Sequence, residues 1–541
     1  MKRTLLGLIL LVLFSCTLSA QEKPKLIVGI VVDQMKQEYL WRFYNDLGEE
    51  GFKRMVEGGF MAKNAHYNYA STSTGPGHAS IYTGTTPSVH GIVNNQWYSP
   101  VWSRSVYCAE DTTVNHVGGS EKAGKISPSN LYSSTITDEL KLTTQKKGKV
   151  IAMSIKDRGS ALPGGHLSDG SYWYDSKTGQ FMTSSYYMKN LPVWVNRFNN
   201  RQLPSQYLSE TWTLSKEKKE YTESGEDNSP YERGFKGKDT PTFPYDLKNL
   251  NASNGGFGML PSTPWGNTIL VDLAVAAIDA EKLGKDEVTD FLAISFSSPD
   301  YIGHNFGPQS KEVQDTYIKL DQELARLFAK LDKAVGEGEY VVFLSADHGV
   351  AENSQRMKDE GFKADNFRSR AFNAYIQATV SRKFGDEKWF KVAIGSDLFL
   401  DHDLIREKGK DLYQMQLFTA QSAMKFDGVY LAMTGTDLTR NSQTEPLRKL
   451  MQNSYHPKES GDVKLIFQPA WQWGGAKGTG HGNAWSYDTH IPIVFYGWGI
   501  KQGTSVRKIH ITDIAPTISM LMNMRFTSGN TGQPIFEALK N

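Results

Sequence analysis

Apolar runs without alternation recur along the chain, and they predict the strands of a buried parallel sheet. A strand that helices cover on both faces needs apolar side chains on both sides, which produces such runs. Segments with helical spacing lie between these runs, so the pattern predicts a doubly wound α/β fold, with a mostly parallel central sheet and helices on both faces. The predicted strands are Lys25–Val32, Lys149–Ile155, Asp290–Ser298, Tyr340–Ala346 and Ile491–Trp498.

Apolar residues three and four positions apart predict the connecting helices. The clearest stripe runs from Val313 to Leu331 and follows Ser310, a residue type that caps helix N-termini well. Three further helices are expected at Tyr39–Glu57, Asn267–Gly284 and Thr512–Met522.

Two stretches break the alternation of strands and helices. Residues from about 159 to 265 are polar and aromatic, with a hairpin-like segment at Tyr172–Phe181 and a part rich in Lys, Glu and Ser at 215–240. We expect this stretch to be an insertion that lies over the site rather than part of the sheet. Residues from about 365 to 475 mix short strands with polar loops, and a second insertion is open there. The catalytic domain would then span residues 21–541.

The first residues have the pattern of a secretory signal peptide. Lys2 and Arg3 precede the apolar run Leu5–Phe14, and small residues end the segment at Ala20. This pattern predicts a signal peptide over residues 1–20 and a periplasmic or secreted protein, with a lipid anchor on Cys16 as the alternative. The apolar run is too short to cross a bilayer, and no later run reaches 18 apolar residues, so we expect no membrane span.

Charge and cysteine content narrow the class of protein. Lys plus Arg number 60 and Asp plus Glu number 58 in the 541 residues. Without Lys2 and Arg3 the two sums are equal, and a net charge of zero argues against a nucleic-acid binder. Cys108 is the only cysteine after the predicted signal peptide, so the mature chain cannot close an internal disulfide. We expect a monomer whose fold depends on its core and on metals.

A hydroxyl group at a predicted helix start is the first candidate for chemistry. In Thr74-Gly75-Pro76-Gly77, proline suits the first turn and the glycines let the backbone approach a ligand closely. Unpaired N–H groups and the positive end of the helix dipole favour an anion such as phosphate at that place. Thr74 is therefore the candidate nucleophile, although a threonine at such a place, taken alone, is more often only a helix cap.

Carboxylates and imidazoles at strand ends and in glycine-rich turns form the second candidate. Asp300 and His304 are four residues apart, so one helical turn would bring them to the same face. Carboxylate and imidazole ligands without thiolate suit a catalytic zinc, with manganese or iron also open. Six such residues divide into two groups of three ligands, which suits a two-metal site for in-line displacement. One of the metals would also acidify the Thr74 hydroxyl. The six residues are Asp33, Asp300, His304, Asp347, His348 and His481.

The order of these motifs resembles that of the alkaline phosphatase superfamily, most closely its phosphate-irrepressible (PafA-type) alkaline phosphatases, over nearly the whole mature chain. The resemblance implies two zinc ions per chain with Thr74 between them. One zinc would be held by Asp300, His304 and His481, the other by Asp33, Asp347 and His348. It also implies hydrolysis of small phosphate monoesters through a phosphothreonine intermediate.

Asn95, Lys156 and Arg158 match the groups that bind phosphoryl oxygens in the PafA-type pattern. If the chain stays extended after its strand, Lys156 and Arg158 lie on the same side. Their two positive charges suit the doubly charged terminus of a monoester, whereas a diester has one of these oxygens blocked.

Two alternatives remain open. One is a nucleotide pyrophosphatase or phosphodiesterase of the same superfamily. The other is a metal-stabilised surface protein that binds phosphorylated glycans without hydrolysing them. Four further histidines are expected to have structural or supporting roles: His66, His78, His90 and His166. Cys108 is expected to be an inert core residue.

Overall fold

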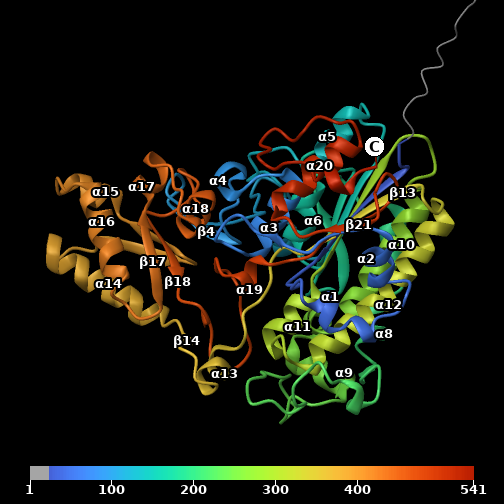
Figure 1. The fold of residues 1–541 in the computed structure, drawn as a ribbon, viewed down its shortest axis with the longest axis horizontal. Coiled ribbons are helices and arrows are strands. Elements are labelled where there is room, and N and C mark those ends of the chain that lie inside the picture. The colour runs from blue at the N-terminus through green and yellow to red at the C-terminus, as the bar shows by residue number, and fades with distance from the viewer. Residues whose placement is uncertain (1–22, 541) are drawn as a thin grey trace, which may run out of the picture.

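The computed structural model describes residues 23–540, so the predicted signal peptide and Cys16 lie outside the described residues. A ten-stranded sheet forms the centre of the molecule, in the order β21-β2-β20-β13-β1-β12-β7-β8-β9-β6 (Figure 1). The bounds in that order are Gly503–Ser505, Phe60–Ala62, Ile493–Gly497, Tyr340–Ser345, Leu26–Val32, Asp290–Phe296, Val150–Ser154, Gly170–Asp175, Gln180–Ser184 and His116–Val117.

The five middle strands, β13, β1, β12, β7 and β8, are parallel. Leu26 of β1 pairs with Tyr340 of β13 on one side and with Asp290 of β12 on the other. Every residue of β1 and β12 is buried, which explains why these segments lack alternation. The predicted fold class is confirmed. The carboxyl ends of these strands meet at one edge, where α/β sheets bind ligands.

Helices cover both faces of the sheet (Figure 1). One layer contains α2 (Phe52–Gly58), α10 (Trp265–Glu281) and α12 (Lys311–Ala334). The opposite layer contains α3 (Thr74–Thr83), α5 (Ile136–Thr143), α6 (Asp157–Gly164) and α20 (Ile514–Leu521). Ser310 caps α12 as predicted, because its hydroxyl accepts a hydrogen bond from the Val313 N–H.

The prediction of one helix over Tyr39–Glu57 was wrong. The chain forms α1 (Tyr39–Arg42), a short 3₁₀ turn and then α2. Gly51 lies directly against Asp321 of α12, where a Cβ atom would come within 2.5 Å of the Asp321 carbonyl oxygen. The Asp321 carboxylate accepts hydrogen bonds from the Gly48 and Phe52 N–H groups at 2.7 Å. These contacts with α12 hold the chain in a turn and break the predicted helix.

Part of the predicted insertion at 159–265 belongs to the sheet, so that prediction was wrong for Gly170–Ser184. Strand β8 pairs in parallel with β7, and β9 pairs with β8 as a hairpin. Tyr172 and Trp173 point to opposite faces and both are buried, so aromatic residues here fill the core on two sides. Farther along, the segment packs on α12: Trp212 Nε1 donates to Asp315 at 2.6 Å and the Tyr245 hydroxyl donates to Glu312 at 2.5 Å.

Between residues 365 and 475 the chain forms a smaller four-stranded sheet with a core of its own, seen at one side of Figure 1. We call this part the small sheet. Its strands, in the order β15-β16-β18-β17, are Phe390–Ile394, Asp397–Leu400, Val463–Phe467 and Val429–Thr434. Helices α14 (Ser369–Phe384) and α16 (Leu412–Ala423) pack on it. We call the rest of the described chain, with the ten-stranded sheet, the main body. The small sheet contacts it where Tyr98 packs against Phe399, with ring centroids 5.3 Å apart.

Candidate active site

Thr74 is the first residue of α3 and is buried. The helix lies very close to the end of β13, because a Cβ atom at Gly77 would come within 2.2 Å of the Asp347 carbonyl oxygen. Only glycine fits there. The Gly75 N–H donates to Asn95 Oδ1 at 2.6 Å, so Asn95 lies at the same helix start. The N-terminus of α3 is thus held against the carboxyl edge of the sheet with Thr74 facing it.

Lys156 and Arg158 both reach the Thr74 hydroxyl. Lys156 Nζ lies 3.5 Å and Arg158 Nη2 lies 3.3 Å from Thr74 Oγ1. The chain does not stay extended after β7, which was our condition for placing Lys156 and Arg158 on the same side, because α6 begins at Asp157. Arg158 is oriented by Tyr107, whose hydroxyl accepts from Nη1 at 3.0 Å and donates to Asp157.

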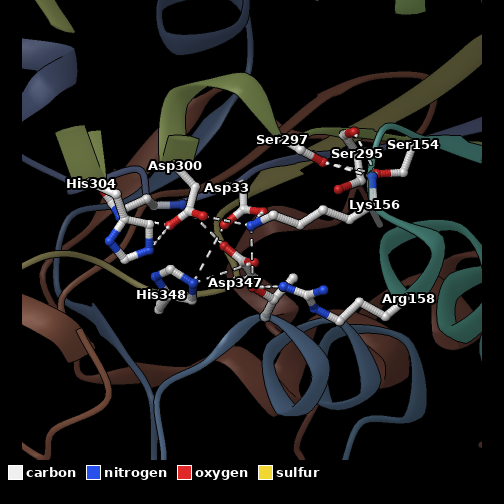
Figure 2. A network of polar contacts seen from close by, with 12 residues as sticks. Asp33, Ser154, Lys156, Arg158, Ser295, Ser297, Asp300, His304, Asp347 and His348 are labelled. Carbon is white, nitrogen blue, oxygen red and sulfur yellow. Dashed lines mark hydrogen bonds and ion pairs between the residues drawn. The ribbon is translucent and has the colours of Figure 1, made fainter. Parts of the chain in front are cut away.

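Three carboxylates meet beside these cations (Figure 2). Asp33 follows β1, Asp347 follows β13, and Asp300 lies in the first turn of α11 (Ser298–Phe306), which follows β12. Lys156 Nζ donates to Asp33 Oδ2 at 2.7 Å and to Asp300 Oδ2 at 2.6 Å. One ammonium group therefore contacts two of three neighbouring carboxylates.

Two imidazoles lie on the Asp300 side. His304 Nε2 is 3.1 Å and His481 Nε2 is 3.7 Å from Asp300 Oδ1, so the predicted helical turn brings Asp300 and His304 together. His304 Nδ1 faces the Thr479 carbonyl oxygen and His481 Nδ1 faces the Thr72 carbonyl oxygen, both at 2.8 Å. A carbonyl on Nδ1 fixes the tautomer and leaves Nε2 for a metal.

The third imidazole lies between the other carboxylates. His348 Nε2 is 3.4 Å from Asp33 Oδ1 and 3.6 Å from Asp347 Oδ2. Donor atoms within 4.8 Å of one another form two groups, Asp300–His304–His481 and Asp33–Asp300–His348. The first group equals one predicted ligand set. In the second, Asp300 stands where the predicted set has Asp347.

Three buried polar atoms at this place make no hydrogen bond to any of the described residues. They are Asp33 Oδ1, Asp347 Oδ2 and His348 Nε2. A buried polar atom without a hydrogen bond costs about 1–3 kcal/mol, and three in one spot call for a ligand. Carboxylate and imidazole donors without thiolate suit zinc and similar divalent cations. The residues present therefore fit a metal centre.

Burial raises the pKa of both Asp347 and Asp300, and the neighbouring charges then shift the two pKa values in opposite directions. Burial, and then the neighbouring Asp33, raise the pKa of Asp347 well above its usual range. Burial acts in the same direction on Asp300, but His304 and Lys156 hold the pKa of that carboxyl well below its usual range. Burial lowers the pKa of His348 to about 3, so its imidazole is neutral, which is the form that binds metals.

The family model for type I phosphodiesterases and nucleotide pyrophosphatases matches residues 27–490. Alkaline phosphatase PafA of Elizabethkingia meningoseptica is 42% identical over 99% of this chain and 99% of its own length. The chain belongs to the alkaline phosphatase superfamily. Within it, alkaline phosphatase PhoV of Synechococcus elongatus is 41% identical over 100% of both chains.

One of these relatives has a solved structure, and another carries a different name. A crystal structure of wild-type alkaline phosphatase PafA superposes with a TM-score of 0.92 at 42% identity, covering 96% of this chain and 100% of that one. A relative from Myroides odoratus, 42% identical over 96% of this chain and 95% of its own length, is named a calcium-transporting ATPase. None of the helices within residues 23–540 is both long and apolar enough to cross a membrane.

We did not predict a role for Gln34 from the sequence, although it contacts one acid of each predicted ligand set. Its side-chain amide donates to Asp300 Oδ1 at 2.6 Å and its N–H donates to Asp347 Oδ1 at 3.1 Å. The residue has a φ of 65°, which is uncommon for a non-glycine residue. Its position directly after Asp33 at a strand end was the only signal in the sequence.

Two residues for which we expected no catalytic role, His78 and Cys108, lie close to the site. His78 Nδ1 faces the Thr74 carbonyl oxygen at 2.8 Å and its Nε2 faces Ser295 Oγ at 2.7 Å, so both ring nitrogens have partners. Burial raises the pKa of the Cys108 thiol to about 12, which keeps it protonated and inert. His66, His90 and His166 have contacts elsewhere in the fold, to Thr489, Ser80 and Asp138 respectively.

Proposed function

We propose that this chain is a zinc-dependent alkaline phosphatase that hydrolyses phosphate monoesters through a covalent phosphothreonine at Thr74. One observation carries the proposal: Lys156 and Arg158 converge on the hydroxyl at the N-terminus of α3. A monoester brings two negative charges to that place, and the two cations together with the helix N-terminus compensate these charges. The full-length similarity to proteins named alkaline phosphatase supports the same assignment.

The proposed metal ligands are those of the sequence prediction. Asp300, His304 and His481 would hold one zinc ion. Asp33, Asp347 and His348 would hold the other, with the Thr74 oxygen as a further ligand. A pair of zinc ions supplies acidification of the nucleophilic hydroxyl and stabilisation of the leaving oxygen. Gln34 would orient Asp300 and Asp347 through the two hydrogen bonds that it donates.

The side chains of the site have different roles in the two halves of the proposed reaction. Thr74 Oγ attacks phosphorus, the bond from phosphorus to the leaving oxygen breaks, and the alcohol departs with a proton. Lys156, Arg158 and the side-chain NH₂ of Asn95 bind the phosphoryl oxygens. Asn95 is suited to this because its Oδ1 already accepts from Gly75 N–H. In the second half, water attacks the phosphothreonine from the vacated side, which releases inorganic phosphate and restores the Thr74 hydroxyl.

The kcat/KM values for phenyl phosphate and for its methyl diester, in the wild type and in a Lys156→Ala/Arg158→Ala double variant, test this function. A charge-assisted hydrogen bond is worth about 1.5–3 kcal/mol, so each residue should contribute roughly ten- to a hundredfold to monoester hydrolysis. Diester hydrolysis should fall much less, because its blocked oxygen has no charge to meet. Equal losses on both substrates would make the pair structural.

A phosphodiesterase is the second candidate, because the matching family model carries that name. The same two substrates separate it from the first. The wild type should prefer phenyl phosphate, and a preference for the diester would reverse the assignment.

We also propose that residues 1–20 are a cleaved signal peptide of a periplasmic or secreted monomer. N-terminal sequencing of the exported protein should begin at Gln21, whereas lipid on Cys16 would indicate an anchored form. Light scattering of the purified protein should give the mass of one chain.

A further inference from the structure

A cavity of about 350 Å³ lies between the main body and the small sheet, directly beside the candidate active site. The main body contributes Ser73, which precedes the nucleophile, together with Asn95 and His481. The small sheet contributes the turn between β15 and β16. The cavity therefore touches the proposed phosphoryl-binding side chain and one proposed metal ligand at once.

The turn from the small sheet is fitted closely to the main body. Gly395 has a φ of +59°, and a Cβ atom there would lie 2.4 Å from Asn94 Nδ2. Asn94 in turn accepts a hydrogen bond from the Ser73 hydroxyl at 3.1 Å and from the Asn95 N–H at 2.8 Å. The wall that the small sheet provides is thus in contact with residues that flank Thr74.

One wall of the cavity carries an anchored aromatic ring. Trp473 lines the cavity and is only partly buried. Its ring packs edge-on against Phe367 and Phe467 of the small sheet's core, with centroids 5.2 and 4.8 Å away. Because the core of the small sheet already holds the Trp473 ring in place, this ring loses little freedom when the ring of a ligand stacks on it.

The cavity is otherwise lined by neutral groups. Hydroxyl, amide and aliphatic side chains surround it, among them Ser396, Gln96 and Ile394. His481 is the one ionisable side chain among the described residues that line it. No lysine, arginine or acidic residue of that lining could pair with a charge on a ligand.

From this lining we infer that the cavity binds the leaving group of the substrate and selects neutral, planar leaving groups, such as nucleosides, over small or anionic ones. The inference rests on the proposed function, since it takes the phosphoryl group to lie at Thr74. A planar group stacks on Trp473, while the amides and hydroxyls satisfy its polar edge. A carboxylate or second phosphate would lose water there without gaining a cation.

Binding to a Thr74→Ala variant loaded with zinc tests the inference without turnover. The measurement is the Kd for adenosine 5′-monophosphate, glycerol 2-phosphate and inorganic phosphate. Stacking of a base on an aromatic ring is worth about tenfold or more in affinity, so the nucleotide should bind about tenfold more tightly than glycerol 2-phosphate. Adding Trp473→Ala should remove this difference and leave the Kd for inorganic phosphate unchanged, and Trp473→Phe should keep most of it.

A matched control is Trp41→Ala, because Trp41 is an exposed tryptophan on α1 that does not line the cavity. It should change none of the three Kd values. Equal affinity for the nucleotide and glycerol 2-phosphate would overturn the inference. So would an equal loss for all three ligands in the Trp473→Ala variant, which would assign that ring to the support of the metal site.

A gain of specificity tests the charge argument. Ile394→Lys places a cation in the cavity, so kcat/KM for 2-phosphoglycolate, which has a carboxylate in its leaving group, should rise about threefold relative to adenosine 5′-monophosphate. Ile394→Met is the control of similar size without charge. An unchanged ratio would overturn the selection against anions. If the wild type hydrolysed no monoester at all, the proposed function would fail, and the binding comparison would still decide the cavity.

Discussion

Two buried contacts between lysine and aspartate in this molecule have the same length and different surroundings. In the small sheet, Lys464 Nζ lies 2.7 Å from Asp397 Oδ2, and Asp397 Oδ1 accepts from the Gly461 N–H at 3.0 Å. At the edge of the central sheet, Lys156 Nζ lies 2.7 Å from Asp33 Oδ2 and also contacts Asp300, with Asp347 beside them.

The two places differ in how fully the charges and the carboxylate oxygens are paired. The small-sheet pair balances one charge with one charge. The site places several acids around a single ammonium group and leaves Asp33 Oδ1 and Asp347 Oδ2 without a hydrogen bond among residues 23–540. A complete buried pair has a structural role, whereas an incomplete one has donor atoms available for cations and substrate.

The largest expected difference between the two regions is their response to removal of metal. A chelator should abolish activity and lower the melting temperature, because Asp33, Asp300 and Asp347 would then crowd like charges together. Zinc should restore both. Elemental analysis should give two zinc ions per chain, and one metal with full activity would contradict the two-metal proposal. Lys464→Met should show the same zinc dependence as the wild type.

Breaking each pair should affect different properties. Lys464→Met leaves Asp397 buried without a counter-charge, and denaturant unfolding should show a loss of about 3–5 kcal/mol. Addition of Asp397→Asn should recover part of that loss, because the unpaired charge is removed. Lys156→Met should instead lower kcat/KM, with a smaller stability change in the zinc-loaded protein. Similar stability losses for both lysines would mean that the Lys156 contacts are structural, like the Lys464–Asp397 pair.

A smaller effect is expected from pH in the small sheet. Asp462 accepts from His402 Nε2 at 2.7 Å and raises the pKa of that imidazole. Since the raised pKa belongs to the folded state, the stabilisation is full below about pH 6.5 and is lost as pH rises through the folded-state pKa. His402 is 46% exposed, so the loss should stay under about 1 kcal/mol. Unfolding curves of the wild type and His402→Gln should converge at high pH.

The sequence predicted best where one rule decides the outcome. Strands buried on both faces need apolar residues throughout, so β1, β12 and β13 were found nearly to the residue. Their ends then placed Asp33 and Asp347 at one edge without any knowledge of the packing. Asp300 was also found at a predicted strand end, and the spacing of four residues predicted that His304 lies on the same side.

The failures came from contacts distant in sequence. Asp321 of α12 turns the chain at Gly51, and no local pattern records it. Tyr172 and Trp173 are aromatic on both faces of β8, which resembles a surface insertion until their burial is known. The approach of Gly395 to Asn94 joins residues 301 positions apart, so the cavity there could not be inferred from spacing.

Trapping the reaction intermediate shows whether Thr74 forms a covalent bond to the phosphoryl group. Zinc-loaded protein should be mixed with a labelled phosphate monoester, quenched in acid within the first turnover, and mapped by mass spectrometry. We expect one phosphate ester on Thr74, no label in Thr74→Ala, and a label on the new hydroxyl in Thr74→Ser, which keeps much of the activity. A label on another residue, or steady turnover by Thr74→Ala, would contradict it.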